Sequence, residues 1–201
     1  MLDFAYRVYR QKLEREVAKG PVPSHIVVVI TPEEFLSGAG GVIRFVEWCV
    51  AFGVREVTFA IDGNPEVDDV AEVAERIPGR IRLITRQSVR EFGGGGVRVN
   101  INLGVGGREE IINAIRSLAE DVVAGKVDPD EVGEEDLGKR LVIRSEPDVI
   151  LRAGLKAKDF LVWQGIYSEH VFFDLDWKSL RYIDFLRILR EYQKRERRYG
   201  R

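Results

Sequence analysis

Cysteine is nearly absent from this chain of 201 residues, because Cys49 is the only one. An intrachain disulfide framework and a multi-cysteine metal site are therefore excluded. Long apolar runs are missing as well. Stretches such as Ile26–Ile30 are far shorter than the roughly 20 residues that a membrane-spanning helix needs. The start of the chain is charged throughout and lacks the apolar segment of a secretory signal. We therefore expect a cytoplasmic protein.

The chain also lacks an excess of charge of either sign. It has 31 Lys and Arg against 33 Asp and Glu, a net charge of −2. This balance excludes a broadly polycationic protein, so we expect no nucleic-acid partner. Histidine is scarce too: His25 and His170 are isolated, and no Ser-His-Asp or Cys-His arrangement for nucleophilic catalysis is supported. Cys49 lies on the apolar side of a helical pattern and is expected in the core.

What the sequence does contain is an alternation of strand-like and helical patterns. Runs rich in consecutive Val and Ile are typical of parallel strands covered on both faces, and they occur at Ile26–Ile30, Glu56–Ile61, Arg80–Thr85, Val97–Leu103, Asp148–Ala153 and His170–Leu175. Helical periodicity is found at Gly41–Phe52, Val67–Ile77, Arg108–Ala124, Phe160–Ser168 and Leu180–Arg198. We predict a single α/β domain over residues 1–201, with a parallel sheet of about six strands and helices on both faces. Gly93–Gly96 is expected to be a flexible connection.

Two motifs have an ordinary structural interpretation beside a functional one. Leu103–Glu109 is a glycine-rich turn between a strand and a helix, where backbone N–H groups can bind phosphate. It is not the dinucleotide-binding fingerprint, because Glu109 stands where the third glycine belongs, and we favour a tight turn. Asp174 and Asp176 could hold a metal or transfer protons. Such a pair more often ends a strand and caps the following helix.

The final segment, Arg181–Arg201, is basic, with eight basic residues and three acidic ones. A solvated basic face is one interpretation, because cations near the carboxyl end of a helix interact favourably with its dipole. Contact with phosphate or diphosphate is the other, since guanidinium groups are well shaped for it.

Longer segments resemble a known family. Gln164–Trp177 and Arg190–Arg201 are similar to the carboxyl-terminal part of cis-prenyltransferases, the undecaprenyl and dehydrodolichyl diphosphate synthases. Further segments match in the same order, at Gly20–His25, Phe52–Phe59, Asn100–Lys126 and Pro147–Arg152. The resemblance implies a parallel sheet wrapped by helices, a dimer, Mg²⁺ as cofactor, and condensation of isopentenyl diphosphate with an allylic diphosphate.

Several positions depart from the pattern of active members. Thr31 stands where they have the aspartate that serves magnesium and diphosphate, and Pro32 removes a backbone N–H. The helix after the second strand would be only about 16 Å long, which is short for the wall of a product tunnel. The residual substrate-binding candidates are Arg152, which matches a family arginine, together with Lys156 and Lys158; Glu169 is a weak metal candidate.

A lost aspartate combined with a retained Arg-x-Gly ending resembles one branch of the family, the non-catalytic subunits similar to the Nogo-B receptor. We therefore predict such a subunit, of archaeal type, in a heteromeric enzyme that makes long-chain polyprenyl diphosphates. The resemblance implies that Arg198 and the backbone N–H of Gly200 bind diphosphate in the active site of a catalytic partner, in a heterodimer or heterotetramer. The partner would hold most of the Mg²⁺ site, and this chain alone would carry no catalytic residue.

Alternatives stay open. The chain could be a self-sufficient cis-prenyltransferase with an atypical metal site, in which Asp62, Glu33 or Asp174 replaces the aspartate. It could also be a binding module on the same scaffold. Peripheral contact with the inner face of the cell membrane would suit a lipid product, and the amphipathic first helix (Phe4, Val8, Leu13) favours it. Packing of that helix on the domain is the competing interpretation.

Overall fold

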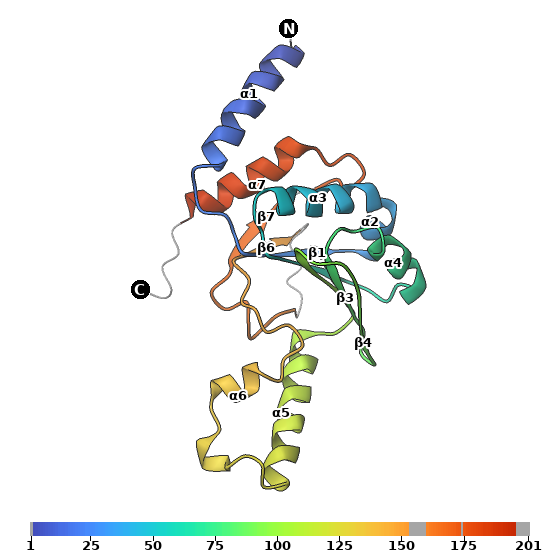
Figure 1. Cartoon of the computed structure of the whole chain (residues 1–201), viewed down its shortest axis with the longest axis vertical. Coiled ribbons are helices and arrows are strands. Elements are labelled where there is room, and N and C mark those ends of the chain that lie inside the picture. Colours follow the sequence, from blue (N-terminus) through green and yellow to red (C-terminus); the bar gives the residue numbers. More distant parts are fainter. Residues whose placement is uncertain (1, 153–159, 174, 196–201) are drawn as a thin grey trace.

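The computed structural model describes residues 2–152, 160–173 and 175–195. Within them a seven-stranded sheet has the order β4-β3-β5-β2-β1-β6-β7 (Figure 1). Its strands are β1 (His25–Ile30), β2 (Glu56–Ile61), β3 (Arg80–Ile84), β4 (Val89–Gly93), β5 (Arg98–Leu103), β6 (Val149–Arg152) and β7 (Glu169–Phe172). Neighbours pair in parallel except β3 and β4. The predicted α/β fold with a mostly parallel sheet is confirmed, with seven strands instead of about six.

β4 is the strand that the sequence pattern did not reveal. It forms an edge of the sheet and its side chains are mostly exposed, so it needs no apolar run. An ion pair between Arg80 and Glu91 helps to hold it antiparallel to β3. The flexible connection predicted at Gly93–Gly96 is therefore wrong in part, because Gly93 is the last residue of the strand, with a φ of +88°.

The helices are α1 (Leu2–Val17), α2 (Pro32–Ser37), α3 (Ala39–Ala51), α4 (Val67–Ala74), α5 (Gly107–Val123), α6 (Glu134–Gly138) and α7 (Tyr182–Lys194). Figure 1 shows α2, α3, α4 and α7 on one side of the sheet, with α1 above α7, whereas α5 and α6 extend from the other side. Cys49 on α3 is buried as predicted, and burial raises the pKa of its thiol. No helix in the described ranges has the length and apolar character to cross a membrane.

On the side of α5, the described residues that pack against the sheet at close range come from bends and turns, at Ile143 and Leu161. The small apolar cluster there consists of Val27, Ile84, Ile143, Ile150 and Leu161. The helix predicted at Phe160–Ser168 is wrong, since the structure has bends and turns in that range. Leu161 takes a left-handed conformation with a φ of 48°, which an L-residue cannot adopt within a right-handed helix.

The opposite face carries the main core, whose centre is filled with aromatic rings. Phe45 on α3 contacts Phe59, Trp177 and Phe185 edge to face, at centroid distances of 6.5, 5.5 and 5.5 Å. Phe35 on α2 contacts Phe59 at 5.6 Å. All five side chains are buried, so α2, α3 and α7 rest on a solid layer of rings.

Candidate functional site

The carboxyl ends of β1, β2 and β5 meet at a cavity of about 170 Å³. Ligands of open parallel sheets bind outside this edge, in a crevice shaped by the loops that leave the strands. The cavity is lined by residues that include Val29, Ile61, Asp62, Asn102, Val105 and Phe160. Among its described lining residues Asp62 alone is charged, so the cavity is mainly apolar.

The glycine-rich turn after β5 forms one side of this cavity, and it is the tight turn that we expected. Asn102 closes it, because its side-chain amide donates to the Val105 carbonyl at 3.2 Å and accepts from the Val105 N–H at 3.1 Å. Gly104 has a φ of +69°, which favours glycine. Sequence reasoning missed Asn102; the available signal was a polar residue next to the apolar end of a strand.

Thr31 is the N-cap of α2. Its Oγ1 accepts the Glu34 N–H at 3.2 Å and donates to Glu34 Oε2 at 2.7 Å, while its own backbone N–H donates to the same oxygen at 2.9 Å. These contacts form a capping box, with Pro32 at the first helical position. α2 was not predicted, although Thr-Pro-Glu-Glu carries the signals of a helix start. The carboxylate of Glu34, four residues after the end of β1, is thus engaged by the cap.

The three carboxylates suggested as substitutes for the family's aspartate separate in the structure. Asp62 lies at the cavity, where its backbone N–H donates to the Ile30 carbonyl at 2.8 Å. Glu33 lies on α2 and lines a different hollow, together with Asp176. Asp174 lies outside the described residues. Of the two described carboxylates, Asp62 is therefore the one that lines the cavity at the carboxyl ends of the central strands.

Asp176 has a structural role. β7 ends at Phe172, so Asp176 is not on the strand. Its carboxylate accepts from the Ser179 hydroxyl at 2.6 Å and from the Lys178 N–H at 3.0 Å, and the Ser179 bond holds its pKa below the usual range. The interpretation that Asp176 ends a strand and caps the following helix is therefore wrong, because α7 begins later at Tyr182, and Asp176 holds the bend before it.

A metal site can be tested from the donors present. Within residues 2–152, 160–173 and 175–195, no three His, Cys, Asp or Glu side chains converge as metal ligands. Mg²⁺ is usually bound through one or two carboxylates, and at the end of β1 the neutral Thr31 stands in their place. Asp62 is the only carboxylate among the described residues that line the carboxyl-end cavity, so this chain offers a Mg²⁺ ion a single carboxylate there.

Arg152 and Glu169 lie at opposite ends of adjacent strands. Arg152 ends β6 opposite Phe172, whereas Glu169 begins β7 opposite Val149. Three residues of strand span about 10 Å, so the two residues do not form one site. Glu169 accepts a hydrogen bond from Arg195 at 3.3 Å, which gives it a partner other than a metal. The buried Nε of Arg152 has no hydrogen-bond partner within the described ranges, which suits contact with an anion.

The other predicted site residues fall outside the described part of the chain. Lys156 and Lys158 belong to residues 153–159, and Arg198 and Gly200 belong to residues 196–201. The diphosphate contacts that the resemblance implies for them stay predictions.

Comparison with known proteins identifies relatives along nearly the whole chain. A family model described as putative undecaprenyl diphosphate synthase matches residues 69–200. An isoprenyl transferase of Thermus thermophilus is 33% identical over 251 aligned residues, covering 98% of this chain and 95% of the relative. The tritrans,polycis-undecaprenyl-diphosphate synthase (geranylgeranyl-diphosphate specific) of Methanopyrus kandleri is 30% identical over 247 residues, with 98% and 91% covered. Because these alignments are longer than this chain of 201 residues, about fifty positions in them have no counterpart here.

Two solved structures share the fold. A lavandulyl diphosphate synthase from Lavandula x intermedia, in complex with dimethylallyl diphosphate, matches with a TM-score of 0.72 at 19% identity, over 92% of this chain and 100% of that one. A probable undecaprenyl diphosphate synthase from Campylobacter jejuni matches with a TM-score of 0.69 at 24% identity, over 90% and 100%. Because the family model and the sequence relatives match along most of its length, the chain belongs to the cis-prenyltransferase family, that of the undecaprenyl diphosphate synthases.

Proposed function

We propose that the chain serves in the condensation of isopentenyl diphosphate with an allylic diphosphate, as a subunit whose partner supplies the metal-binding carboxylate. The names of the relatives support the reaction class. One observation supports the assignment of the metal-binding carboxylate to a partner chain. Thr31 and Glu34 form a capping box at the end of β1, where active members need an aspartate. Mg²⁺ would then be held mainly by the partner.

The space around the cavity supports the same proposal. About 170 Å³ is well below the roughly 300–1,000 Å³ of ordinary small-molecule pockets. α4 has eight residues and is thus about 12 Å long, shorter still than the helix that we expected. Phe45 and Phe59 fill the core on the helix-covered face. A long polyprenyl product would therefore be accommodated by the partner.

An apolar surface is available for such a partner. Exposed apolar side chains occur on α5 and on the segment up to the end of β7, namely Ile112, Ile115, Val162, Ile166 and Phe172. The first turn of α5 lies next to the turn that holds Val162, since a Cβ on Gly107 would lie 2.9 Å from the Val162 side chain. Surfaces of this kind are typical of protein interfaces. Arg198 and Gly200 would then reach the diphosphate site of the partner.

The first helix offers a second surface. Leu13 and Val17 are buried, so the carboxyl-terminal half of α1 packs on the domain, which was the competing interpretation. Phe4 is 75% exposed and Val8 is 49% exposed. We infer that this exposed half contacts the membrane that receives the lipid product.

A self-sufficient cis-prenyltransferase is the second candidate, and it fits the comparisons at least as well. The relatives at 30–33% identity carry the names of enzymes. Asp62 is the observation in its favour, because it is a carboxylate at the cavity and directly follows β2. No observation on the described residues specifically favours the unrelated binding module.

The two candidates differ in what the lone chain can do. We expect the purified chain to be inactive in a condensation assay with isopentenyl diphosphate, an allylic diphosphate and Mg²⁺. A second chain with an intact aspartate motif should co-purify in stoichiometric amount from the native host, as identified by mass spectrometry, and should restore turnover.

Variants then locate the contribution of each chain. In the complex, Arg198→Ala should reduce turnover at least 100-fold without loss of assembly, because a diphosphate would lose a charge-assisted contact. Arg197→Ala removes the same charge from the adjacent position and is the control. If the lone wild-type chain turns over substrate and Asp62→Asn abolishes that activity, the subunit proposal is contradicted and the self-sufficient enzyme is established.

A further inference from the structure

A second cavity, with a volume of about 540 Å³, lies between the face of the sheet and the segment after α6, and it reaches the amino ends of β2, β3 and β5. Glu56, Arg80 and Arg98 are the first residues of β2, β3 and β5, and they are paired in register. Three parallel strands thus bring their first side chains to one place. The segment after α6 closes the other side with Arg140 and Arg144.

Arginine dominates the lining of this cavity. Its positively charged lining residues are Arg80, Arg82, Arg98, Arg140 and Arg144, and its negatively charged ones are Glu56 and Glu91. Asp121 adds one further carboxylate, which binds Arg140 at 2.6 Å. Positive charge is therefore in excess here, although the whole chain has a net charge of −2. A concave surface with one sign of charge in excess attracts ligands of the opposite sign.

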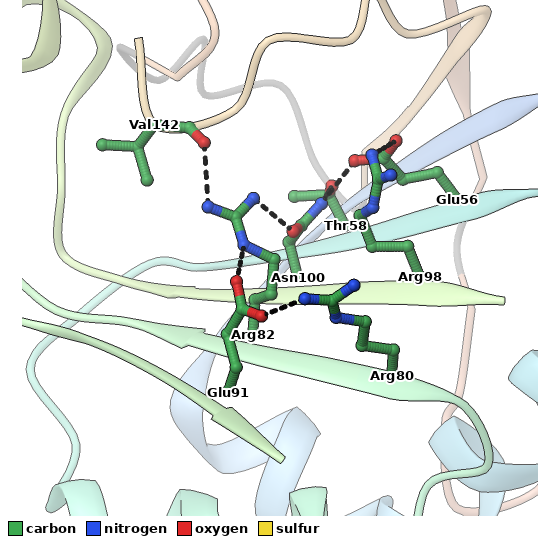
Figure 2. A network of polar contacts seen from close by, with 8 residues as sticks. All are labelled: Glu56, Thr58, Arg80, Arg82, Glu91, Arg98, Asn100 and Val142. Carbon is green, nitrogen blue, oxygen red and sulfur yellow. Dashed lines mark hydrogen bonds and ion pairs between the residues drawn. The ribbon is translucent and has the colours of Figure 1, made fainter. Parts of the chain in front are cut away.

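Arg82 is fixed in the wall of the cavity by three contacts (Figure 2). Its Nε lies 3.2 Å from Glu91 Oε1, and its two terminal nitrogens donate at 3.2 Å to Asn100 Oδ1 and to the Val142 carbonyl. Glu91 also accepts from Arg80, and this bond holds the pKa of the Glu91 carboxyl below its usual range. The contact with Val142 ties the segment after α6 to the sheet. The cavity is thus organised before a ligand arrives, which reduces the cost of binding.

Buried polar groups support this wall from inside the sheet (Figure 2). Asn100 donates to Glu56 Oε1 at 2.7 Å and to Thr58 Oγ1 at 3.0 Å, and Thr58 contacts Nε2 of His25 at 2.8 Å. All four side chains are buried. Because these partners are fixed, the amide that orients Arg82 has little freedom to turn.

Three of the arginines retain donors for a ligand. A guanidinium group has five N–H donors. Arg80 and Arg98 each use one terminal nitrogen, on Glu91 and Glu56 respectively. Arg144 is exposed, and the described part of the chain gives it no hydrogen bond or ion pair.

We propose that this cavity binds a phosphate-type oxyanion, with Arg80, Arg98 and Arg144 as its donors. Guanidinium groups match the spacing of phosphate oxygens and bind them with two parallel hydrogen bonds. The ligand would be a free anion or a phosphoryl group on a larger molecule. This cavity shares no lining residue with the cavity at the carboxyl ends of β1, β2 and β5, so the inference does not depend on the proposed function.

Calorimetric titration of the full chain with inorganic phosphate and with glycerol phosphate tests this site. Arg144→Gln should weaken the binding of both about tenfold, the loss of one charge-assisted hydrogen bond. It should leave thermal stability unchanged, since Arg144 has no internal partner in the described structure. Arg116→Gln, on the exposed side of α5, is the matched control and should bind like the wild type. Glu91→Gln should tighten binding, because its carboxylate competes for Arg80 and Arg82.

The proposal is overturned if the wild-type chain binds neither probe, or if Arg144→Gln and Arg116→Gln bind equally well. The second result would assign anion binding to another part of the molecule. Comparable affinity for the two probes would support a phosphoryl group on a larger molecule as the ligand. Tighter binding of inorganic phosphate, lost in Arg144→Gln, would support a free anion.

Discussion

The carboxyl ends of the strands surround about 170 Å³ with mainly apolar side chains and a single carboxylate, whereas the cavity of about 540 Å³ that reaches their amino ends is lined by five arginines. Open parallel sheets ordinarily bind ligands at their carboxyl ends. Here that end is built from a turn closed by Asn102 and a helix capped by Thr31. The difference teaches that the position of a cavity in a fold does not supply the charge that its ligand requires. At the carboxyl end, Arg152 is the one predicted cation within the described residues, and the other predicted cations belong to residues 153–159 and 196–201.

Removal of an aromatic ring should have the largest effect on the free energy of unfolding. It tests whether the core behind the carboxyl end is closely packed. Phe45→Ala should lower the free energy of unfolding by about 3–5 kcal/mol, because Phe45 is fully buried among three other rings. Urea denaturation measures this loss. Val50→Ala, at a half-exposed position of the same helix, is the control. A loss below about 1 kcal/mol for Phe45→Ala would indicate adaptable space, as in a product tunnel.

At the amino end, Arg82→Ala should lower the free energy of unfolding by about 2–3 kcal/mol. Asn100 Oδ1 and the Val142 carbonyl would each lose a donor, and Glu91 would lose one of its two arginines. Arg90→Ala on the exposed edge strand removes the same side chain without these contacts, and it should change stability by less than about 0.5 kcal/mol. Equal losses in the two variants would show that the arginine cavity has no rigid wall.

Acid should destabilise the protein through His25, which lies in the buried layer behind the arginine cavity. Burial lowers the pKa of His25 in the folded state, so below its unfolded value of about 6.5 the unfolded chain binds more protons. The contribution of the neutral His25 to the free energy of unfolding is therefore fully present above pH 6.5. It falls as the pH drops toward the pKa of the folded state, by at most about 1.4 kcal/mol per pH unit. Urea denaturation between pH 7.5 and pH 5.5 should show a smaller decline for His25→Asn than for the wild type. Parallel declines would contradict the assignment.

The smallest effect concerns the cap at the end of β1. Thr31→Ala should lower the free energy of unfolding by about 1 kcal/mol, because it removes the hydroxyl of the capping box. Thr31→Ser keeps that hydroxyl and should be nearly neutral. Thermal denaturation of the two variants distinguishes them. If they were equally stable, the hydroxyl would have no structural role and Thr31 would be available for a ligand.

Sequence patterns predicted the central strands and the main helices because buried β-branched runs and helical periodicity reflect the same burial that stabilises them. They failed where burial is weak: β4 is an exposed edge strand, and Leu161 takes a left-handed turn inside an apolar run. Asp62 could be placed at the carboxyl end because it directly follows β2. The arginine cavity could not be foreseen, since Arg80, Arg98 and Arg144 come from separate segments that only strand register and the covering segment bring together.

The position of β1 between β2 and β6 has a consequence for synthesis on the ribosome. β2 follows β1 closely along the chain, but β6 begins only at Val149. At translation rates of about 5–20 residues per second, the second edge of β1 stays without its partner for roughly 6–24 s. During that interval the nascent chain presents the apolar edge of Ile26–Val29, which pairs with β6 in the finished protein. The strand that is made first is thus completed by β6, a strand made late, and a bound chaperone would protect the emerging chain at this edge.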